Sequence, residues 1–279
     1  MNDQRHHRDG PASLHGLRQS LLGGSLGASA REHGKPDERF VSLLAPSSFE
    51  AEQYRGLRYV IEESGKHVVA ITSPTPGDGK TTTAINLAGA LAQDQGTRVL
   101  LAEVDLRQPR VGEQLGLPRS GAPGFADAVA DDRLALSDVV QHVAPFHLWV
   151  LLAGRSPDGP YEVLKSPRLE QLLDEARQQY DYVVLDTPPV VPVPDTRLIA
   201  RGVDGLLIVV SAHQTSRTLL EEALAALGPT KVLGLVFNRD DDRRRGYYGY
   251  EYYSSSPEPK GRRWRRRGRA TRERLGGRG

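Results

Sequence analysis

The sequence predicts an α/β fold in which a mostly parallel sheet is flanked by helices on both faces. Three observations support this prediction: short apolar segments rich in β-branched residues, helical segments between several of them, and a Gly-rich loop directly after the first apolar segment. Strands that are covered on both faces are continuously apolar. A strand, helix, strand repeat builds a parallel sheet through right-handed crossovers. A chain of 279 residues can hold one such domain together with terminal extensions.

Six segments are predicted to be strands and five to be helices. The predicted strands are residues 67–72, 98–104, 148–152, 182–186, 205–210 and 232–237. The predicted helices are residues 48–63, 80–93, 167–179, 195–201 and 215–227. The first helix has Ser48 as a plausible N-cap, and its apolar residues recur at helical spacing. In an open sheet of this kind ligands bind beyond the carboxyl ends of the strands, so candidate site residues are sought there.

The composition divides the chain into four parts. Residues 1–45 are rich in Gly, Ser, His and Arg, and we expect them to be a disordered leader. Residues 46–240 hold the predicted domain, and residues 241–253 contain a cluster of tyrosines. Residues 254–279 carry ten Lys or Arg against two Glu, a net charge of +8 in a chain whose total is +2, so we expect a basic disordered tail.

Two absences from the sequence limit the possible chemistry. The chain has no cysteine, which excludes disulfides, cysteine-ligated metal sites and thiol nucleophiles. No stretch approaches the roughly 18 apolar residues that span a bilayer, and the polar start of the chain lacks the apolar core of a signal peptide. We therefore expect a cytoplasmic protein.

The loop at residues 73–82 lies between the first predicted strand and an apolar helix. Gly79, Lys80 and Thr81 satisfy the end of the phosphate-loop pattern G-x-x-x-x-G-K-[ST], whereas Pro74 stands where the pattern has its first Gly. Such a loop lets backbone N–H groups and a helix N-terminus converge on phosphate oxygens. Lys80 is predicted to reach the β- and γ-phosphates, and Thr81 to bind Mg²⁺. The predicted nucleotide-binding residues of this loop are Pro76, Gly77, Asp78, Gly79, Lys80, Thr81 and Thr82.

Acidic residues stand at the ends of two further predicted strands. Glu103 and Asp105 are two residues apart, and therefore on one side of an extended segment, while Asp186 ends a buried strand. Carboxylates at such positions can hold Mg²⁺ directly or through water. Taken singly, either Asp could instead be a helix cap or a turn residue. Together with Lys80 the acids are more typical of a phosphate and metal site than of isolated caps or turns.

A cluster of tyrosines follows the last predicted strand. It sits with Gly between a block of charges and a Ser/Pro-rich stretch, so burial of these rings in a core is not expected. We predict that they are phosphate acceptors in a mobile segment, and the alternative is an adhesive low-complexity segment. The clustered residues are Tyr247, Tyr248, Tyr250, Tyr252 and Tyr253.

These motifs together resemble those of the bacterial tyrosine kinases of capsule and exopolysaccharide synthesis, the CpsD/CapB type. The resemblance covers roughly residues 48–253 and rests on the phosphate loop, on the acidic motifs at residues 100–107 and 183–188, and on the tyrosine cluster. It implies a P-loop NTPase fold related to MinD and ParA, with residues 46–240 as the kinase domain. It also implies ATP and Mg²⁺ as cofactors and tyrosine phosphorylation as the reaction.

The resemblance further assigns roles to single residues. It implies Lys80, Glu103, Asp105 and Asp186 as the catalytic residues and Thr81, Asp105 and Asp186 as the metal ligands. Lys80 would stabilise the transferred charge, and Glu103, where the family usually has Asp, would be the base for the tyrosine hydroxyl. A phenol with a pKa near 10 is mostly neutral at pH 7, so a base helps. Because Glu is one methylene longer, a shift of about 1 Å can lower the rate roughly a hundredfold. Asn238, after the last strand, stands where MinD-like ATPases read adenine; its alternative role is that of a turn residue at a strand end.

The resemblance also implies partners. Glu52, Arg55 and Arg58 match the family pattern E-x-x-R-x-x-R, whose helix mediates assembly of a ring-like homo-oligomer. Such a stripe alone is more typical of a solvated helix face, and the family context reverses that preference. Autophosphorylation of the tyrosine cluster would then occur in trans. A membrane polysaccharide chain-length regulator would activate the kinase and hold it at the inner face of the plasma membrane.

Two alternatives and the basic tail stay open at this point. A positioning ATPase of the MinD/ParA type would carry a second Lys early in the loop, where this chain has Thr75. A catalytically weak ATP-binding regulatory partner of the chain-length regulator is the other alternative, and Glu103 is the feature that favours it. The run at residues 262–267 combines Arg with Trp264, which suits an anionic membrane or a solvated tail, and nucleic acid is not an expected partner.

Overall fold

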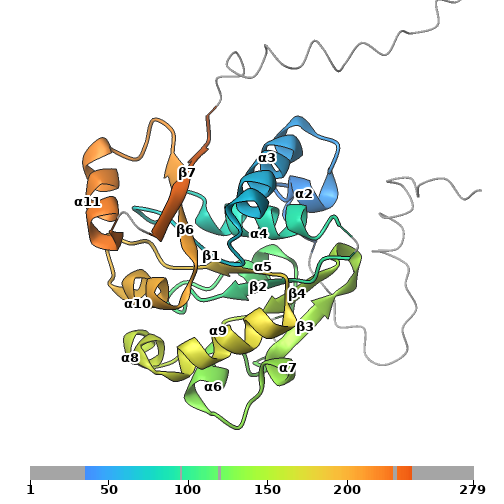
Figure 1. Ribbon diagram of the computed structural model, residues 1–279, viewed down its shortest axis with the longest axis vertical. Coiled ribbons are helices and arrows are strands. Elements are labelled where there is room, and N and C mark those ends of the chain that lie inside the picture. Colours follow the sequence, from blue (N-terminus) through green and yellow to red (C-terminus); the bar gives the residue numbers. More distant parts are fainter. Residues whose placement is uncertain (1–34, 95, 119–120, 229–230, 241–279) are drawn as a thin grey trace, which may run out of the picture. The chain divides into compact units, whose positions relative to one another are not determined.

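The computed structural model describes residues 35–94, 96–118, 121–228 and 231–240. Over these residues a seven-stranded sheet has the order β3-β4-β2-β5-β1-β6-β7 (Figure 1). The strands are β1 Val68–Thr72, β2 Val99–Glu103, β3 Val140–Val143, β4 Leu148–Leu151, β5 Tyr182–Asp186, β6 Gly205–Ser211 and β7 Val232–Asn238. Only the β3–β4 pair among them is antiparallel, so the predicted α/β fold with a mostly parallel sheet is confirmed.

The strand register brings the ends of three strands together. Within the sheet, β1 pairs with β5 through Ile71 and Asp186, and β2 pairs with β5 through Glu103 and Asp186. Because these pairs are parallel, the carboxyl ends of β1, β2 and β5 lie at one edge of the sheet. The phosphate loop after β1 therefore lies beside the acidic motifs after β2 and β5.

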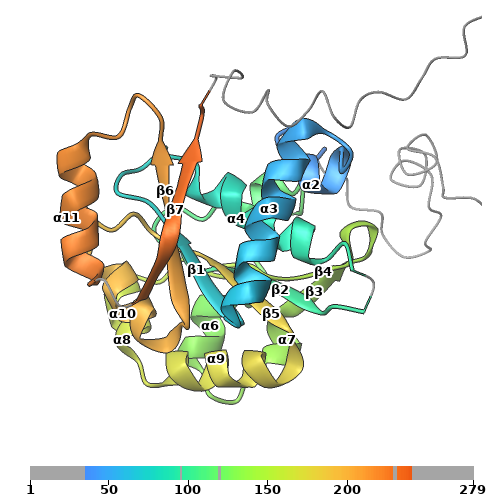
Figure 2. The ribbon, with the colours of Figure 1, turned by 45° about the horizontal axis from the view of Figure 1, so that its top comes forward.

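Helices cover both faces of the sheet (Figure 2). Helices α2, α3, α4 and α5 pack on one face, where Ile85 and Leu87 of α4 lie in a core with Val69 and Val184 of the sheet. Helices α6 to α10 pack on the other face, where Phe125 and Leu172 lie in a second core. The helices are α2 Val41–Leu44, α3 Phe49–Ser64, α4 Lys80–Leu91, α5 Val111–Gln114, α6 Phe125–Ala130, α7 Leu136–Val139, α8 Pro160–Lys165, α9 Arg168–Gln179, α10 Asp195–Gly202 and α11 Arg217–Leu227, with a short 3₁₀ helix at Ala144–Phe146.

The structure adds elements that the sequence did not predict. Strand β3 is an edge strand in which Gln141 and His142 stand between two valines, and its residues are only half-buried or exposed, so it lacks the continuous apolar pattern of the other strands. Helices α2, α5, α6, α7 and α8 have four to six residues. Such lengths span less than two helical turns, too few for an apolar period to be recognised.

The boundary expected for the leader, at residue 45, is wrong. Phe40 is fully buried, and helix α2 packs on α4 directly after it. The cause is a buried amide: the Asn86 side chain of α4 accepts from Ser42 N–H and donates to the Arg39 carbonyl, at 3.0 Å each. The folded domain therefore begins before residue 46. Residues 1–34, the tyrosine cluster and the basic tail lie outside the described residues.

Along the part of the chain that the structure describes, none of the helices combines the length and the apolar character that crossing a membrane requires.

Candidate functional site

The phosphate loop joins β1 to α4 and is closed by hydrogen bonds of its own. Gly77 and Gly79 have φ angles of +88° and +102°, a backbone conformation that glycine adopts without strain. The Asp78 carboxylate accepts from the backbone N–H and the hydroxyl of Thr75, at 2.9 Å each. Gly79 is the N-cap of α4, so the first N–H groups of this 12-residue helix open toward the loop. This arrangement is suited to binding an anion.

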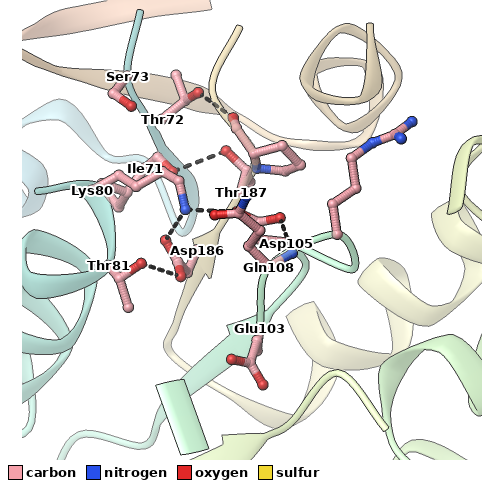
Figure 3. A network of polar contacts seen from close by, with 12 residues as sticks. Ile71, Thr72, Ser73, Lys80, Thr81, Glu103, Asp105, Gln108, Asp186 and Thr187 are labelled. Atoms are coloured by element: carbon pink, nitrogen blue, oxygen red, sulfur yellow. Dashed lines mark hydrogen bonds and ion pairs between the residues drawn. The ribbon is translucent and has the colours of Figure 1, made fainter. Parts of the chain in front are cut away.

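Lys80, the first residue of α4, lies between the two predicted acidic ligands (Figure 3). Its Nζ atom is 2.7 Å from Asp105 Oδ2 and 3.7 Å from Asp186 Oδ1. Burial by itself would lower the pKa of Lys80, but the charges of Asp186 and Asp105 outweigh it and raise the pKa above its ordinary value. The lysine is therefore a fixed positive charge at the carboxyl edge of the sheet.

Asp186 is the most deeply buried acid of the site. Its Oδ2 atom accepts from the Thr81 hydroxyl at 2.8 Å, whereas its buried Oδ1 atom has no hydrogen-bond partner. Burial raises the pKa of Asp186 to about 6, although Lys80 and Thr81 act in the opposite direction. Asp105 is held differently, because its Oδ1 atom accepts from Gln108 N–H at 3.0 Å and its own N–H donates to the Asp186 carbonyl at 3.0 Å.

The donor set fits a magnesium ion that also binds phosphate. Thr81, Asp105 and Asp186 present hydroxyl and carboxylate oxygens, the ligand type that Mg²⁺ prefers, and the unbonded Asp186 Oδ1 is a buried acceptor available for such an ion. Within the described ranges no group of three or more His, Cys, Asp or Glu residues is placed to hold a metal by itself. A site of this kind suits Mg²⁺, which usually keeps waters and substrate phosphates among its ligands.

Glu103 does not join the group around Lys80 (Figure 3). Its carboxylate accepts from Val111 N–H at 2.5 Å and from Ala153 N–H at 3.0 Å. Burial raises its pKa above the ordinary value, and these backbone hydrogen bonds oppose the shift. Glu103 also lines a hollow of about 410 Å³ together with Gly112 and Leu152. The side chain thus holds the start of α5 while facing a cavity beside the site.

Asn238 lies against the phosphate loop. Its Nδ2 atom donates to the Asp78 carbonyl at 2.9 Å, and its Oδ1 atom accepts from Arg239 N–H at 2.9 Å. A Cβ atom on Gly79 would come within 1.9 Å of the Asn238 amide nitrogen, so only glycine fits at that position. Both ends of the predicted adenine-reading amide are therefore engaged by the protein backbone.

The charged residues predicted for oligomerisation make contacts within the chain. Arg55 forms an ion pair with Glu52 on the surface of α3. Arg58 donates to Glu62 at 2.6 Å and to the Ala90 carbonyl at the end of α4 at 3.1 Å. The two arginines thus have different environments, and Arg58 also ties α3 to α4.

Two groups of residues at the site were not predicted from the sequence. Asp195, fully buried at the start of α10, accepts two hydrogen bonds from Arg107, at 2.7 and 3.0 Å. Thr215, between β6 and α11, donates to Asp78 at 2.8 Å. Arg107, the cation that ends the acidic motif at residues 100–107, was a visible signal for the first contact, but its partner is 88 residues away. The Thr215 contact spans 137 residues. No local pattern identifies such pairs.

Comparison with known proteins shows which family and which relatives the domain is similar to. Residues 69–256 match the model of the CobQ/CobB/MinD/ParA nucleotide binding domain. The tyrosine-protein kinase YwqD of Bacillus subtilis is 35% identical over 216 residues, which cover 75% of this chain and 90% of that protein. The succinoglycan biosynthesis transport protein ExoP of Rhizobium meliloti is 32% identical over 222 residues, covering 73% of this chain. The matched region spans only 27% of the length of ExoP.

A solved structure agrees with these relatives. The kinase domain of the Escherichia coli tyrosine kinase ETK superposes with a TM-score of 0.67 at 26% identity. The match covers 79% of this chain and 86% of that one. The likeness therefore extends over most of the chain and is not confined to the phosphate loop.

Proposed function

The chain belongs to the bacterial tyrosine-protein kinases of the CobQ/CobB/MinD/ParA nucleotide-binding family, and from that premise we propose that it uses Mg·ATP to phosphorylate its own C-terminal tyrosines in trans. The observation that carries the proposal is the meeting of Lys80, Asp105 and Asp186 at the N-terminus of α4. A cation, two acids and a helix start that opens toward an anion are what phosphoryl transfer needs.

Each residue of the site has a separate proposed role in phosphoryl transfer. The N–H groups at the start of α4 bind phosphate oxygens, and Lys80 offsets the charge that develops on the transferred group. Thr81, Asp105 and Asp186 would hold the Mg²⁺, which when bound supplies charge neutralisation between the β- and γ-phosphates. The phenol oxygen forms a bond to the γ-phosphorus as the bond to the β-phosphate oxygen breaks, which leaves ADP. The phenol proton passes to Glu103, which faces the neighbouring hollow.

The sequence and the relatives support the proposed acceptors and the proposed assembly. Tyr247, Tyr248, Tyr250, Tyr252 and Tyr253 are proposed to enter the site of a neighbouring copy in a ring-like oligomer. Helix α3 supports a subunit contact, because Tyr59 and Val60 are exposed beside its charged residues. The name of ExoP, a succinoglycan biosynthesis transport protein, supports a role in polysaccharide biosynthesis and transport. The proposed activator is a membrane polysaccharide chain-length regulator. The protein would then act in the cytoplasm at the inner face of the plasma membrane, where the basic tail is complementary to anionic lipid.

A second candidate function rests on Glu103. Both of its carboxylate oxygens already accept backbone N–H groups, which oppose the rise of its pKa caused by burial and hold the side chain toward the backbone. A protein that binds ATP and regulates the polysaccharide system without efficient transfer to tyrosine would fit this feature.

To test the proposal, the purified chain is incubated with Mg·ATP, alone and with the cytoplasmic segment of a candidate membrane activator. The phosphorylated residues are then identified by mass spectrometry. The kinase proposal predicts phosphate on residues 247–253 that is lost in Lys80→Met and kept in Lys165→Met, an exposed lysine at the end of α8. ATP binding without phosphotyrosine would select the regulatory role, and hydrolysis without phosphotyrosine a positioning ATPase.

A mixing experiment tests transfer in trans. One chain carries Lys80→Met and keeps its tyrosines, and the other keeps Lys80 but has its five clustered tyrosines replaced by Phe. Phosphate on the Lys80→Met chain would support transfer between copies. Its absence, while the unmodified chain phosphorylates itself, would contradict transfer in trans.

A further inference from the structure

Asp78 connects the phosphate loop to the far half of the sheet. Its side chain is 4% exposed, and its Oδ2 atom closes the loop by accepting from Thr75. Its Oδ1 atom accepts from the Thr215 hydroxyl at 2.8 Å. One carboxylate therefore joins the loop to itself and to a residue 137 positions later in the chain.

The position of Thr215 is itself fixed by two hydrogen bonds to the backbone of Ser211. Its hydroxyl oxygen accepts from Ser211 N–H at 3.0 Å, and its own N–H donates to the Ser211 carbonyl at 3.0 Å. Ser211 is the last residue of β6, which pairs directly with β1. The hydroxyl that reaches Asp78 is thus fixed to the central part of the sheet.

Asn238 holds the same residue of the loop from the neighbouring strand. It ends β7, and its carbonyl accepts from Ala212 N–H at 2.8 Å, so the strand end is tied to the residue after β6. Its amide donates to the Asp78 carbonyl at 2.9 Å. The amide nitrogen also fills the space that a Cβ on Gly79 would occupy. Thr215 binds the side chain of Asp78, and Asn238 binds its backbone.

We infer that Thr215 and Asn238 are positioning residues, which brace the phosphate loop from β6 and β7 and so set the affinity for the triphosphate of any nucleotide, whatever its base. The inference rests on nucleotide binding at the proposed site. Backbone N–H groups bind phosphate well only if the loop is already ordered, because ordering it on binding would consume part of the binding free energy. Among the described residues no hydrogen bond or ion pair joins Thr215 or Asn238 to Lys80, Asp105 or Asp186, so their effect on the site is indirect.

The test compares three ligands at constant Mg²⁺: ATP, GTP and inorganic tripolyphosphate. Asn238→Ala and Thr215→Val, which removes the hydroxyl and keeps the shape, are each expected to weaken all three by a similar factor of about five to ten, as the loss of one hydrogen bond predicts. Thr215→Ser, which keeps the hydroxyl, should bind like the unmodified chain. Thr218→Val, at an exposed position on α11, is the matched control.

The possible results separate the explanations. A loss in Asn238→Ala that is confined to ATP would overturn the brace at Asn238 and assign the residue to adenine recognition. Unchanged affinities in Thr215→Val would overturn the brace at Thr215. A drop of the thermal midpoint with unchanged affinities would show a merely structural role, which also overturns the inference. If the unmodified chain binds none of the three ligands, the proposed function itself fails together with the brace.

Discussion

The Lys80 ammonium lies 2.7 Å from the Asp105 carboxylate, although Asp105 follows β2 and the sheet places β5 between β2 and β1. The cation of the phosphate loop is therefore already paired before any nucleotide enters. A nucleotide must draw Lys80 toward phosphate oxygens, which leaves the two acids without their counter-charge. This exchange makes nucleotide binding and metal binding interdependent at this site.

Asp105→Asn should change how nucleotide affinity depends on metal. Without Mg²⁺ the variant should bind ATP more tightly than the unmodified chain, because one acid no longer repels the phosphates or competes for Lys80. Adding Mg²⁺ should raise the ATP affinity of the unmodified chain by a factor several-fold larger than the factor for the variant. Titration with a fluorescent ATP analogue in EDTA and in excess Mg²⁺ measures both. Equal responses to Mg²⁺ would contradict the role of Asp105, and Asp158→Asn, an exposed acid, is the control.

The contribution of Asp186 to the free energy of unfolding is expected to decrease as the pH rises. Its pKa is about 6 in the folded chain, against 3.8 for the free side chain, so the folded state binds the proton more tightly. The unfolding free energy is therefore highest, for this group, below about pH 4 and declines as the pH rises through about 6. The shift corresponds to about 3 kcal/mol at most. In Asp186→Asn this decline should disappear.

Thermal unfolding of the metal-free chain between about pH 4 and pH 8 measures the effect. The quantity of interest is the difference between the unmodified chain and Asp186→Asn at each pH, because other carboxyls titrate in both. Parallel curves for the two proteins would show that Asp186 is not the titrating group.

Substitution of Glu103 is expected to affect the rate of phosphoryl transfer to tyrosine more than the affinity for ATP. Glu103→Gln is expected to lower the rate of tyrosine phosphorylation about a hundredfold, the lower range for loss of a general base, and to leave the ATP dissociation constant within about twofold. Because burial raises its pKa, the acidic limb of the pH–rate profile should lie above the ordinary value of 4.5 and be absent from the variant. Glu170→Gln, exposed on α9, is the control. An unchanged rate in Glu103→Gln would remove Glu103 from the mechanism.

Arg107 should position the loop that carries Asp105. It makes two hydrogen bonds to the buried Asp195, a geometry that Lys cannot reproduce. Arg107→Lys is expected to lower kcat about tenfold and to raise the Mg²⁺ concentration needed for half-maximal rate, with the KM for ATP little changed. Arg133→Lys is a matched control, because Arg133 makes the same paired contacts to Asp131 on the surface. A change in KM alone would contradict the positioning role.

The sheet and the phosphate site were predictable because their signals are local. Buried parallel strands are continuously apolar, and Lys80, Thr81, Asp105 and Asp186 follow such strands at the edge where they meet. The predicted P-loop architecture is confirmed by the fold and by the relatives. The roles of the individual site residues remain predictions.

The remaining features depend on contacts between distant segments. The Arg107–Asp195 pair and the braces on Asp78 join residues that no spacing rule connects. The early start of the domain has the same origin, because Asn86 within α4 fixes the backbone around Ser42. The orientation of the Glu103 side chain could not be predicted either, because the N–H groups that donate to its carboxylate belong to Val111 and Ala153, in two different segments that only the fold brings together.

Calorimetric titration of the full chain with ATP at millimolar Mg²⁺ shows whether the loop at residues 73–82 binds the nucleotide. We expect saturable heat at a one-to-one stoichiometry, an affinity at least tenfold weaker in Lys80→Met, and an unchanged affinity in Lys165→Met. An absence of heat from the unmodified chain, or equal affinities in all three proteins, would contradict the assignment of this loop as the ATP site.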